Sequence, residues 1–300
     1  MILRDYQNEL ADAIRTDFAR GSKTVLAVAP TGSGKTVLFT YMARRAAERG
    51  NRVGILVHRQ ELLRQTSAAL DCDHGLIAAG HHPRYDKQIQ IASVQTLVNR
   101  LDRYDFDFLI VDEAHHARAK TYESIIAANP NARVLGVTAT PIRQDGKGLA
   151  DLFETMVLGP SVPSLIASGW LCQPDVYVPG RIDVAGVSRS RGDFQRGQLS
   201  VAADKPTITG CAIEHYRKLA HQKPAIAFTV SVEHAEHTAE AFRLAGYRAV
   251  AVSAKTDPKK RKQAIDGLAS GEYHVVANCD LFGEGVDVPV VACGIMLRPR

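Results

Sequence analysis

The sequence has no long apolar run, and no stretch approaches the ~20 residues that a membrane-spanning helix needs. Its first residues, MILRDYQNEL, carry acids and amides where a signal peptide needs an apolar segment. Aromatic residues are scarce at 6%, and the five cysteines are scattered without a C-x-x-C pair. These absences argue against a membrane protein, a secreted disulfide scaffold and a cysteine-based zinc site, and they predict a cytoplasmic protein.

What the chain does have is an ordinary globular composition, with 45% hydrophobic and 23% charged residues over 300 positions. That length fits two domains, each large enough to bury its own core. The formal net charge of +5 favours a polyanionic partner, although many unrelated proteins share so small an excess.

Short β-branched runs alternate with amphipathic stretches, and this alternation occurs twice along the chain. It predicts βαβ units and therefore two α/β domains with mostly parallel sheets. The predicted strands are 24–29, 53–58, 89–92, 108–111 and 133–137 in the first half, and 225–229, 248–252, 274–278 and 291–297 in the second. The predicted helices are 36–48, 60–70, 232–245 and 258–269.

Between the two halves the pattern fades into Gly, Pro, Ser and Arg, including the run SRSRGDFQRGQ. We therefore expect a first domain at 1–160, an irregular connection at 161–206 and a second domain at 207–300.

The sharpest chemical motif is APTGSGKT, from Ala29 to Thr36, at the junction of a predicted strand and a predicted helix. Triphosphate binding needs a loop whose backbone N–H groups point inward, which glycines permit. A lysine then reaches the β and γ phosphates, and a hydroxyl at the helix start can bind Mg²⁺. The motif predicts an ATP site formed by Pro30, Thr31, Gly32, Ser33, Gly34, Lys35 and Thr36.

A second motif, FLIVDEAH from Phe108 to His115, places two carboxylates directly after an apolar strand. Alone, such a pair is more often a solvated loop or a helix cap. Beside a phosphate loop, Asp112 can hold Mg²⁺ with Thr36, while Glu113 can accept a proton from the attacking water. Lys35, Asp112 and Glu113 are therefore the candidate catalytic residues.

Together with these motifs, several others give the chain a resemblance to superfamily 2 helicases and translocases of the DEAH-box, RadD-like and XPB-like kind, with an ATPase core like that of type III restriction enzyme Res subunits. The further motifs are LRDYQ, VHRQELLRQ, ASVQTL, TATPIR, IAFTVSVEHA and ANCDLFGEGVDVP, which follow the family's order along nearly the whole chain. The resemblance implies two RecA-like domains with MgATP in the cleft between them.

The resemblance also implies roles for individual residues. Gln7 would bind adenine through its amide, with Arg4 nearby, and Gly283, Gly285 and Asp287 would contact the nucleotide from the second domain. His115, Thr138 and Thr140 would couple the state of the phosphates to domain position. The residues that would hold the backbone of a nucleic acid strand are Arg59, Gln65, Ser93, Gln95 and Thr96.

Contacts of that kind suit phosphates rather than bases, so binding would be strongly salt-dependent and weakly sequence-specific. DNA is favoured over RNA because RadD-like and XPB-like proteins work on DNA in repair or unwinding. The family pattern continues into a helix with arginines, and this sequence stops at LRPR before it. Two alternatives therefore stay open at this point: a nucleic-acid-binding module deficient in hydrolysis, and a phosphate-loop ATPase acting on protein partners.

Overall fold

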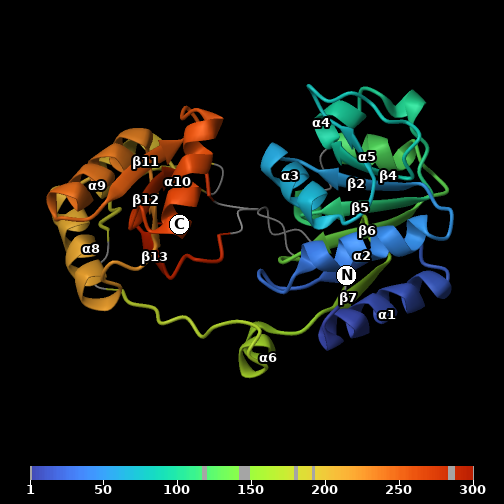
Figure 1. Ribbon diagram of the computed structural model, residues 1–300, viewed down its shortest axis with the longest axis horizontal. Coiled ribbons are helices and arrows are strands. Elements are labelled where there is room, and N and C mark those ends of the chain that lie inside the picture. The colour runs from blue at the N-terminus through green and yellow to red at the C-terminus, as the bar shows by residue number, and fades with distance from the viewer. Residues whose placement is uncertain are drawn as a thin grey trace. The chain divides into compact units, whose positions relative to one another are not determined.

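The chain forms two compact units, Met1–Pro174 and Asp175–Arg300, in a computed structural model (Figure 1). The structure describes residues 2–116, 120–141, 149–178, 182–190, 193–282 and 288–299. Each unit is an α/β layer structure around its own core.

The first unit contains a seven-stranded sheet whose pairs are all parallel, in the order β3-β4-β2-β5-β6-β1-β7. Its strands are β1 (Thr24–Val28), β2 (Val53–Val57), β3 (Gly75–Ile77), β4 (Ile89–Ser93), β5 (Phe108–Asp112), β6 (Arg133–Thr138) and β7 (Thr155–Leu158). Its helices are α1 (Asp5–Ala19), α2 (Lys35–Ala47), α3 (Gln60–Ala69), α4 (Val94–Leu97), η1 (Leu101–Arg103), η2 (Ala114–His116), α5 (Lys120–Ala127) and α6 (Val162–Ala167).

Alternation along the strands gives this sheet two buried faces. In β5, Ile110 packs into one cluster with α1, α2 and α3, whereas its neighbours Leu109 and Val111 pack into the other with α4 and α5. Fully buried strands explain why these segments are continuous apolar runs rather than alternating ones. Because every strand is parallel, all carboxyl ends meet at one edge of the sheet, where ligands of such folds bind.

The second unit contains a four-stranded parallel sheet in the order β11-β12-β10-β13. Its elements are β8 (Arg189–Ser190), β9 (Asp193–Phe194), α7 (Arg196–Ala203), α8 (Pro206–Leu219), β10 (Ala225–Thr229), α9 (Val232–Leu244), β11 (Ala249–Ser253), α10 (Pro258–Ser270), β12 (Val275–Cys279) and β13 (Cys293–Met296). Helices α8 and α9 cover one face of the sheet and α10 covers the other.

The segment predicted as an irregular connection, 161–206, is divided between the two units and is more regular than expected. It contains α6, the antiparallel pair β8–β9 and α7. Each of the two short helices buries a leucine, Leu165 in α6 and Leu199 in α7. So few apolar positions leave a weak periodic pattern in the sequence. The predicted limits of the two domains stay a prediction.

A buried amide joins β5 to α5 in the first unit. Asn129 is 3% exposed, and its Oδ1 accepts from the Phe106 N–H at 2.8 Å while its Nδ2 donates to the Ile125 carbonyl at 2.8 Å. We expect Asn129→Ala to destabilise the first unit by about 1–3 kcal/mol, because it leaves a buried N–H and a buried carbonyl without these bonds. Urea unfolding measures this as a lower midpoint. Asn99→Ala is the control, since Asn99 is exposed, and equal midpoints for the two variants would contradict the expectation.

Candidate nucleotide and nucleic-acid sites

The phosphate loop joins β1 to α2 at the carboxyl edge of the first sheet. Gly32 and Gly34 have φ angles of 82° and 77°, in the left-handed region that favours glycine, and Gly34 caps the N-terminus of α2. The loop therefore ends at the N–H groups of a 13-residue helix, whose partial positive charge favours anions. Ser33 Oγ is buried here and has no hydrogen-bond partner among the described residues.

Tyr6 and Gln7, on the first turn of α1, donate hydrogen bonds to the backbone of this loop. The Gln7 Nε2 group donates to the Ser33 carbonyl at 3.0 Å and to the Gly34 carbonyl at 3.3 Å, while its Oε1 accepts from the Arg4 N–H at 3.0 Å. Tyr6 Oη also donates to Ser33 O, at 2.9 Å. The adenine contact predicted for Gln7 stays a prediction, and its amide in this structure binds the loop backbone.

The acidic pair lies close enough to the loop lysine for their charges to interact. Burial lowers the pKa of the Lys35 amine, and the carboxylates of Glu113 and Asp112 act in the opposite direction. Lys35 Nζ donates to the Pro30 carbonyl at 3.4 Å. The structure thus brings together the three residues predicted to be catalytic, from β1–α2 and from the end of β5.

The two carboxylates differ in their surroundings. Asp112 is 5% exposed, and burial, followed by repulsion from Glu113, raises its pKa to about 7. Glu113 follows with a φ of 49°, a left-handed conformation that costs a non-glycine residue about 1–3 kcal/mol. Its backbone N–H donates to Asp112 Oδ1 at 2.9 Å.

A buried carboxylate with a raised pKa is stabilised in its charged form by a nearby cation. Asp112 and the Thr36 hydroxyl, both oxygen donors, are of the type that Mg²⁺ prefers. These donor types suit Mg²⁺, and the metal site predicted at Thr36 and Asp112 stays a prediction.

A chain of polar contacts leads from Glu113 to the end of β6. His115 Nδ1 lies 3.4 Å from Glu113 Oε2 and 3.2 Å from Thr138 Oγ1. Thr138 Oγ1 donates to the Thr140 carbonyl at 3.0 Å, and the Thr138 carbonyl accepts from the Ala29 N–H at 3.0 Å. The three residues predicted to couple phosphate state to domain position thus form a chain of contacts that begins at Glu113 and reaches Ala29 at the start of the loop.

The residues predicted to hold nucleic acid follow two paired strands, β2 and β4, at their carboxyl ends. Arg59 precedes α3 directly, and Gln65 lies further along that helix. Ser93 Oγ donates to Gln95 Oε1 at 2.8 Å, and Gln95 Nε2 donates to the His58 carbonyl at 3.3 Å, which joins the two strand ends. Thr96 is partly exposed on α4 beside them. These residues therefore share the edge that carries the phosphate loop.

Three predicted nucleotide contacts of the second unit, Gly283, Gly285 and Asp287, lie outside the described residues. The strand before them, β12, is described up to its end. Asn278 there is 1% exposed and donates to the Ala227 carbonyl at 3.0 Å, while its Oδ1 accepts from the Phe282 N–H at 3.2 Å. This buried amide therefore links the end of β12 to β10 and to Phe282, which directly precedes the undescribed residues.

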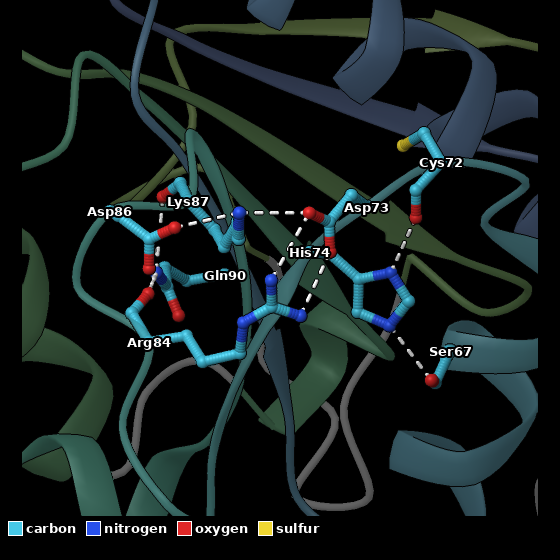
Figure 2. A network of polar contacts seen from close by, with 8 residues as sticks. All are labelled: Ser67, Cys72, Asp73, His74, Arg84, Asp86, Lys87 and Gln90. Carbon is cyan, nitrogen blue, oxygen red and sulfur yellow. Dashed lines mark hydrogen bonds and ion pairs between the residues drawn. The ribbon is translucent and has the colours of Figure 1, made fainter.

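Two hollows of the first unit lie around the segments that lead into β3 and β4, away from the phosphate loop. One of about 310 Å³ is lined by Cys72, Asp73, His74, Leu76, His81, His82 and Arg84. Figure 2 shows the ion pairs beside it, in which Asp73 faces both Arg84 and Lys87. These pairs are exposed, so solvent and salt screen them, and none of the predicted site residues lines the hollow.

Two residues near the phosphate loop, Trp170 and Leu171, belong to none of the sequence motifs. Arg4 lies over the ring of Trp170, with 4.1 Å between Arg4 Cζ and the ring centre, and the side chain of Leu171 lies against Gly32. Trp170 and Leu171 both lie just after α6. The one available clue is that Trp170 is the only tryptophan of the sequence.

One family model, described as type III restriction enzyme, res subunit, matches residues 1–143, and another, described as helicase conserved C-terminal domain, matches residues 209–300. A 51.5 kDa protein of a Lactococcus phage is 34% identical over 90% of this chain. The Saccharomyces cerevisiae protein IRC3, whose name assigns it provisionally to the ATP-dependent helicases, is 29% identical over 99% of the chain.

The chain spans 58% of the phage protein and 47% of IRC3, about half of their length. Among solved structures, the Hef helicase domain of Pyrococcus furiosus is similar with a TM-score of 0.61 and 16% identity, covering 99% of this chain and 90% of that one. The DNA-bound restriction-modification enzyme LlaBIII is similar with a TM-score of 0.72 and 17% identity, covering all of this chain and 26% of that one. At these identities the likeness concerns the fold.

The two units are therefore RecA-like α/β domains, which confirms the predicted fold class. The chain belongs to the superfamily 2 helicases, with an ATP-binding domain of the type III restriction enzyme Res-subunit kind. Among the described residues, no helix has both the length and the apolar character needed to cross a bilayer.

Proposed function

We propose that this chain is the ATPase core of a nucleic-acid helicase or translocase that acts on DNA in preference to RNA. One observation carries the proposal: a phosphate loop, its lysine and an acidic pair meet at the same sheet edge as the Arg59 and Gln95 strand ends. The names of relatives support a helicase or translocase, since they include a DNA 3'-5' translocase of Sulfurisphaera tokodaii and an ATP-dependent RNA helicase of Candida glabrata.

In this proposal MgATP binds with its phosphates on the loop, against Lys35 and Ser33. Asp112 and Thr36 hold the metal, and Glu113 takes a proton from the water that attacks the γ phosphate. The contacts from Glu113 through His115 to Thr138 then link hydrolysis to the loop and to the end of β6. Hydrolysis occurs at the cleft between the two domains, where Gly283, Gly285 and Asp287 complete the site.

A strand of nucleic acid binds along the ends of β2 and β4, where Ser93, Thr96 and Gln65 also lie. The contacts are to phosphates, so affinity falls steeply with salt. The predicted cytoplasmic location rests on the N-terminal sequence and stays a prediction.

The test of this function is ATP turnover with single-stranded DNA, duplex DNA and RNA compared side by side. We expect DNA to stimulate turnover more than RNA does. Turnover that no nucleic acid changes would favour an ATPase that acts on protein partners, and binding of ATP and DNA without any turnover would favour the hydrolysis-deficient module.

Binding of the nucleic acid itself is tested with Arg59→Ala. If Arg59 neutralises one phosphate, its loss lowers the slope of log affinity against log salt by about one. Fluorescence anisotropy of a labelled oligonucleotide at several KCl concentrations measures that slope. Arg45→Ala is the matched control, because Arg45 is exposed in the last turn of α2, at the amino edge, and pairs with Glu48. Equal slopes for Arg59→Ala and the unmodified protein would remove Arg59 from the binding surface.

A further inference from the structure

A tyrosine of helix α5, outside every sequence motif, is buried near the acidic pair. Tyr122 is 2% exposed and belongs to the same core cluster as Val111 and Ala114. These two residues stand on either side of Asp112 and Glu113 in the sequence. The charge of Asp112 acts on the Tyr122 phenol, so the two side chains are close enough to interact electrostatically. A polar group is therefore buried near the carboxylate that is predicted to hold the metal.

The Tyr122 hydroxyl keeps its proton at physiological pH. Burial, followed by the negative charge of Asp112, raises the pKa of the phenol, so the side chain always offers one O–H donor. The Oη atom is buried, and among the described residues it has no hydrogen-bond partner. A buried donor without an acceptor is costly, and a bound water commonly joins polar groups that do not touch directly.

Asp112 is an acceptor that suits this donor. The carboxylate is 5% exposed, and its Oδ1 accepts from the Glu113 N–H at 2.9 Å. A carboxylate has about four acceptor sites, so it can receive further donors. Carboxylates that bind metals are themselves hydrogen-bonded by outer residues, which orient them and tune their affinity for the metal.

We propose that Tyr122 positions Asp112 for the magnesium ion of the bound nucleotide, with its O–H donating to one bound water that in turn donates to the carboxylate. The proposal rests on the proposed function, in which Asp112 holds that metal. Tyr122 is a positioning residue, since it acts through Asp112 and touches neither the nucleotide nor the metal. A donor to the carboxylate favours its charged form and restricts its orientation.

The experiment compares binding of MgATP with binding of ATP in EDTA, which removes the metal, by isothermal titration calorimetry. Tyr122→Phe removes only the hydroxyl. We expect it to weaken MgATP binding about tenfold, the lower end of what the loss of an outer partner costs a metal site. Affinity for metal-free ATP should stay unchanged, because the hydroxyl acts on the nucleotide only through the metal ligand.

The matched control is Tyr104→Phe, which should bind both forms of ATP like the unmodified protein. Tyr104 also has a buried Oη without a partner among the described residues. It lies before β5, however, whereas Asp112 is the last residue of that strand. The two variants therefore remove the same group at opposite ends of one strand.

A double-mutant cycle with Asp112→Asn separates positioning of the carboxylate from support of the core. In the Asp112→Asn background, Tyr122→Phe should lower MgATP affinity no further. An equal loss in both backgrounds, or an equal loss of MgATP and metal-free ATP, would overturn the inference, because the phenol would then only support the fold. Unchanged MgATP affinity in Tyr122→Phe would overturn it as well. The proposed function fails instead if the unmodified protein binds neither form of ATP, so the two failures are distinguishable.

Discussion

Lys35→Ala is expected to weaken MgATP binding by about 30-fold to several thousand-fold, which corresponds to the roughly 2–5 kcal/mol lost when one partner of a desolvated charge pair is removed. The lysine is the cation of the loop, and burial already lowers the pKa of its amine. Removing it takes away the positive charge that interacts with Glu113 and Asp112 and, in our proposal, with the phosphates. Calorimetric titration with MgATP measures the loss, and ATP turnover should fall with it.

The matched control is Lys23→Ala. Lys23 is exposed and lies just before β1, so it stands at the opposite end of the strand that leads into the phosphate loop. It should bind MgATP like the unmodified protein. Unchanged ATP affinity in Lys35→Ala would show that the loop does not bind the triphosphate.

Glu113→Gln is expected to keep ATP affinity within about threefold while lowering the turnover number by about 10²- to 10⁴-fold, the usual contribution of general-base catalysis. The amide keeps the shape of the side chain but cannot accept the proton of the attacking water. It also retains a carbonyl oxygen that can face His115, so the contact toward Thr138 need not be lost. Single-turnover hydrolysis, measured alongside equilibrium binding, separates the two effects.

Glu123→Gln on α5 removes the same charge from an exposed position of the same unit and should change neither quantity. If Glu113→Gln hydrolyses ATP at the normal rate, another group serves as the base. If instead it fails to bind ATP, the carboxylate has a structural role in the loop.

Much of the fold could be predicted from the sequence because parallel strands buried on both faces leave continuous apolar runs. The strand at 225–229 lies where predicted, and the other predicted strands and helices agree within two residues at each end. The junctions were predictable for the same reason: a glycine-rich turn after β1 and an acidic pair after β5 follow apolar runs directly.

Other elements left no such pattern. β7 is an edge strand whose residues alternate between half-buried and exposed, so its sequence resembles a loop. The helix α8 has Thr and Gly between its apolar positions and lies just after the segment expected to be irregular. Trp170 is distant in sequence from Arg4 and Tyr6. The parallel pairing of β7 with β1 helps to bring the segment after β7 near these two residues.

The candidate site shows the same division between local and long-range information. Lys35, Asp112 and Glu113 could be predicted as candidates because each occupies a short motif at a strand end. The hydrogen bonds from the Gln7 amide to the Ser33 and Gly34 carbonyls could not be predicted, because they depend on how α1 packs against the loop. Motifs specify which groups are present, whereas tertiary packing decides which of their hydrogen bonds remain available.

The position of β1 between β6 and β7 has an evolutionary consequence. The phosphate loop leaves β1 itself, Thr138 ends its inner neighbour β6, and Asp112 and Glu113 follow β5 one strand further in. β7, the outer neighbour, lies at the edge of the sheet and carries none of these motifs. Substitutions at that edge can therefore accumulate while the inner strands, which supply the predicted hydrolytic groups, stay the same.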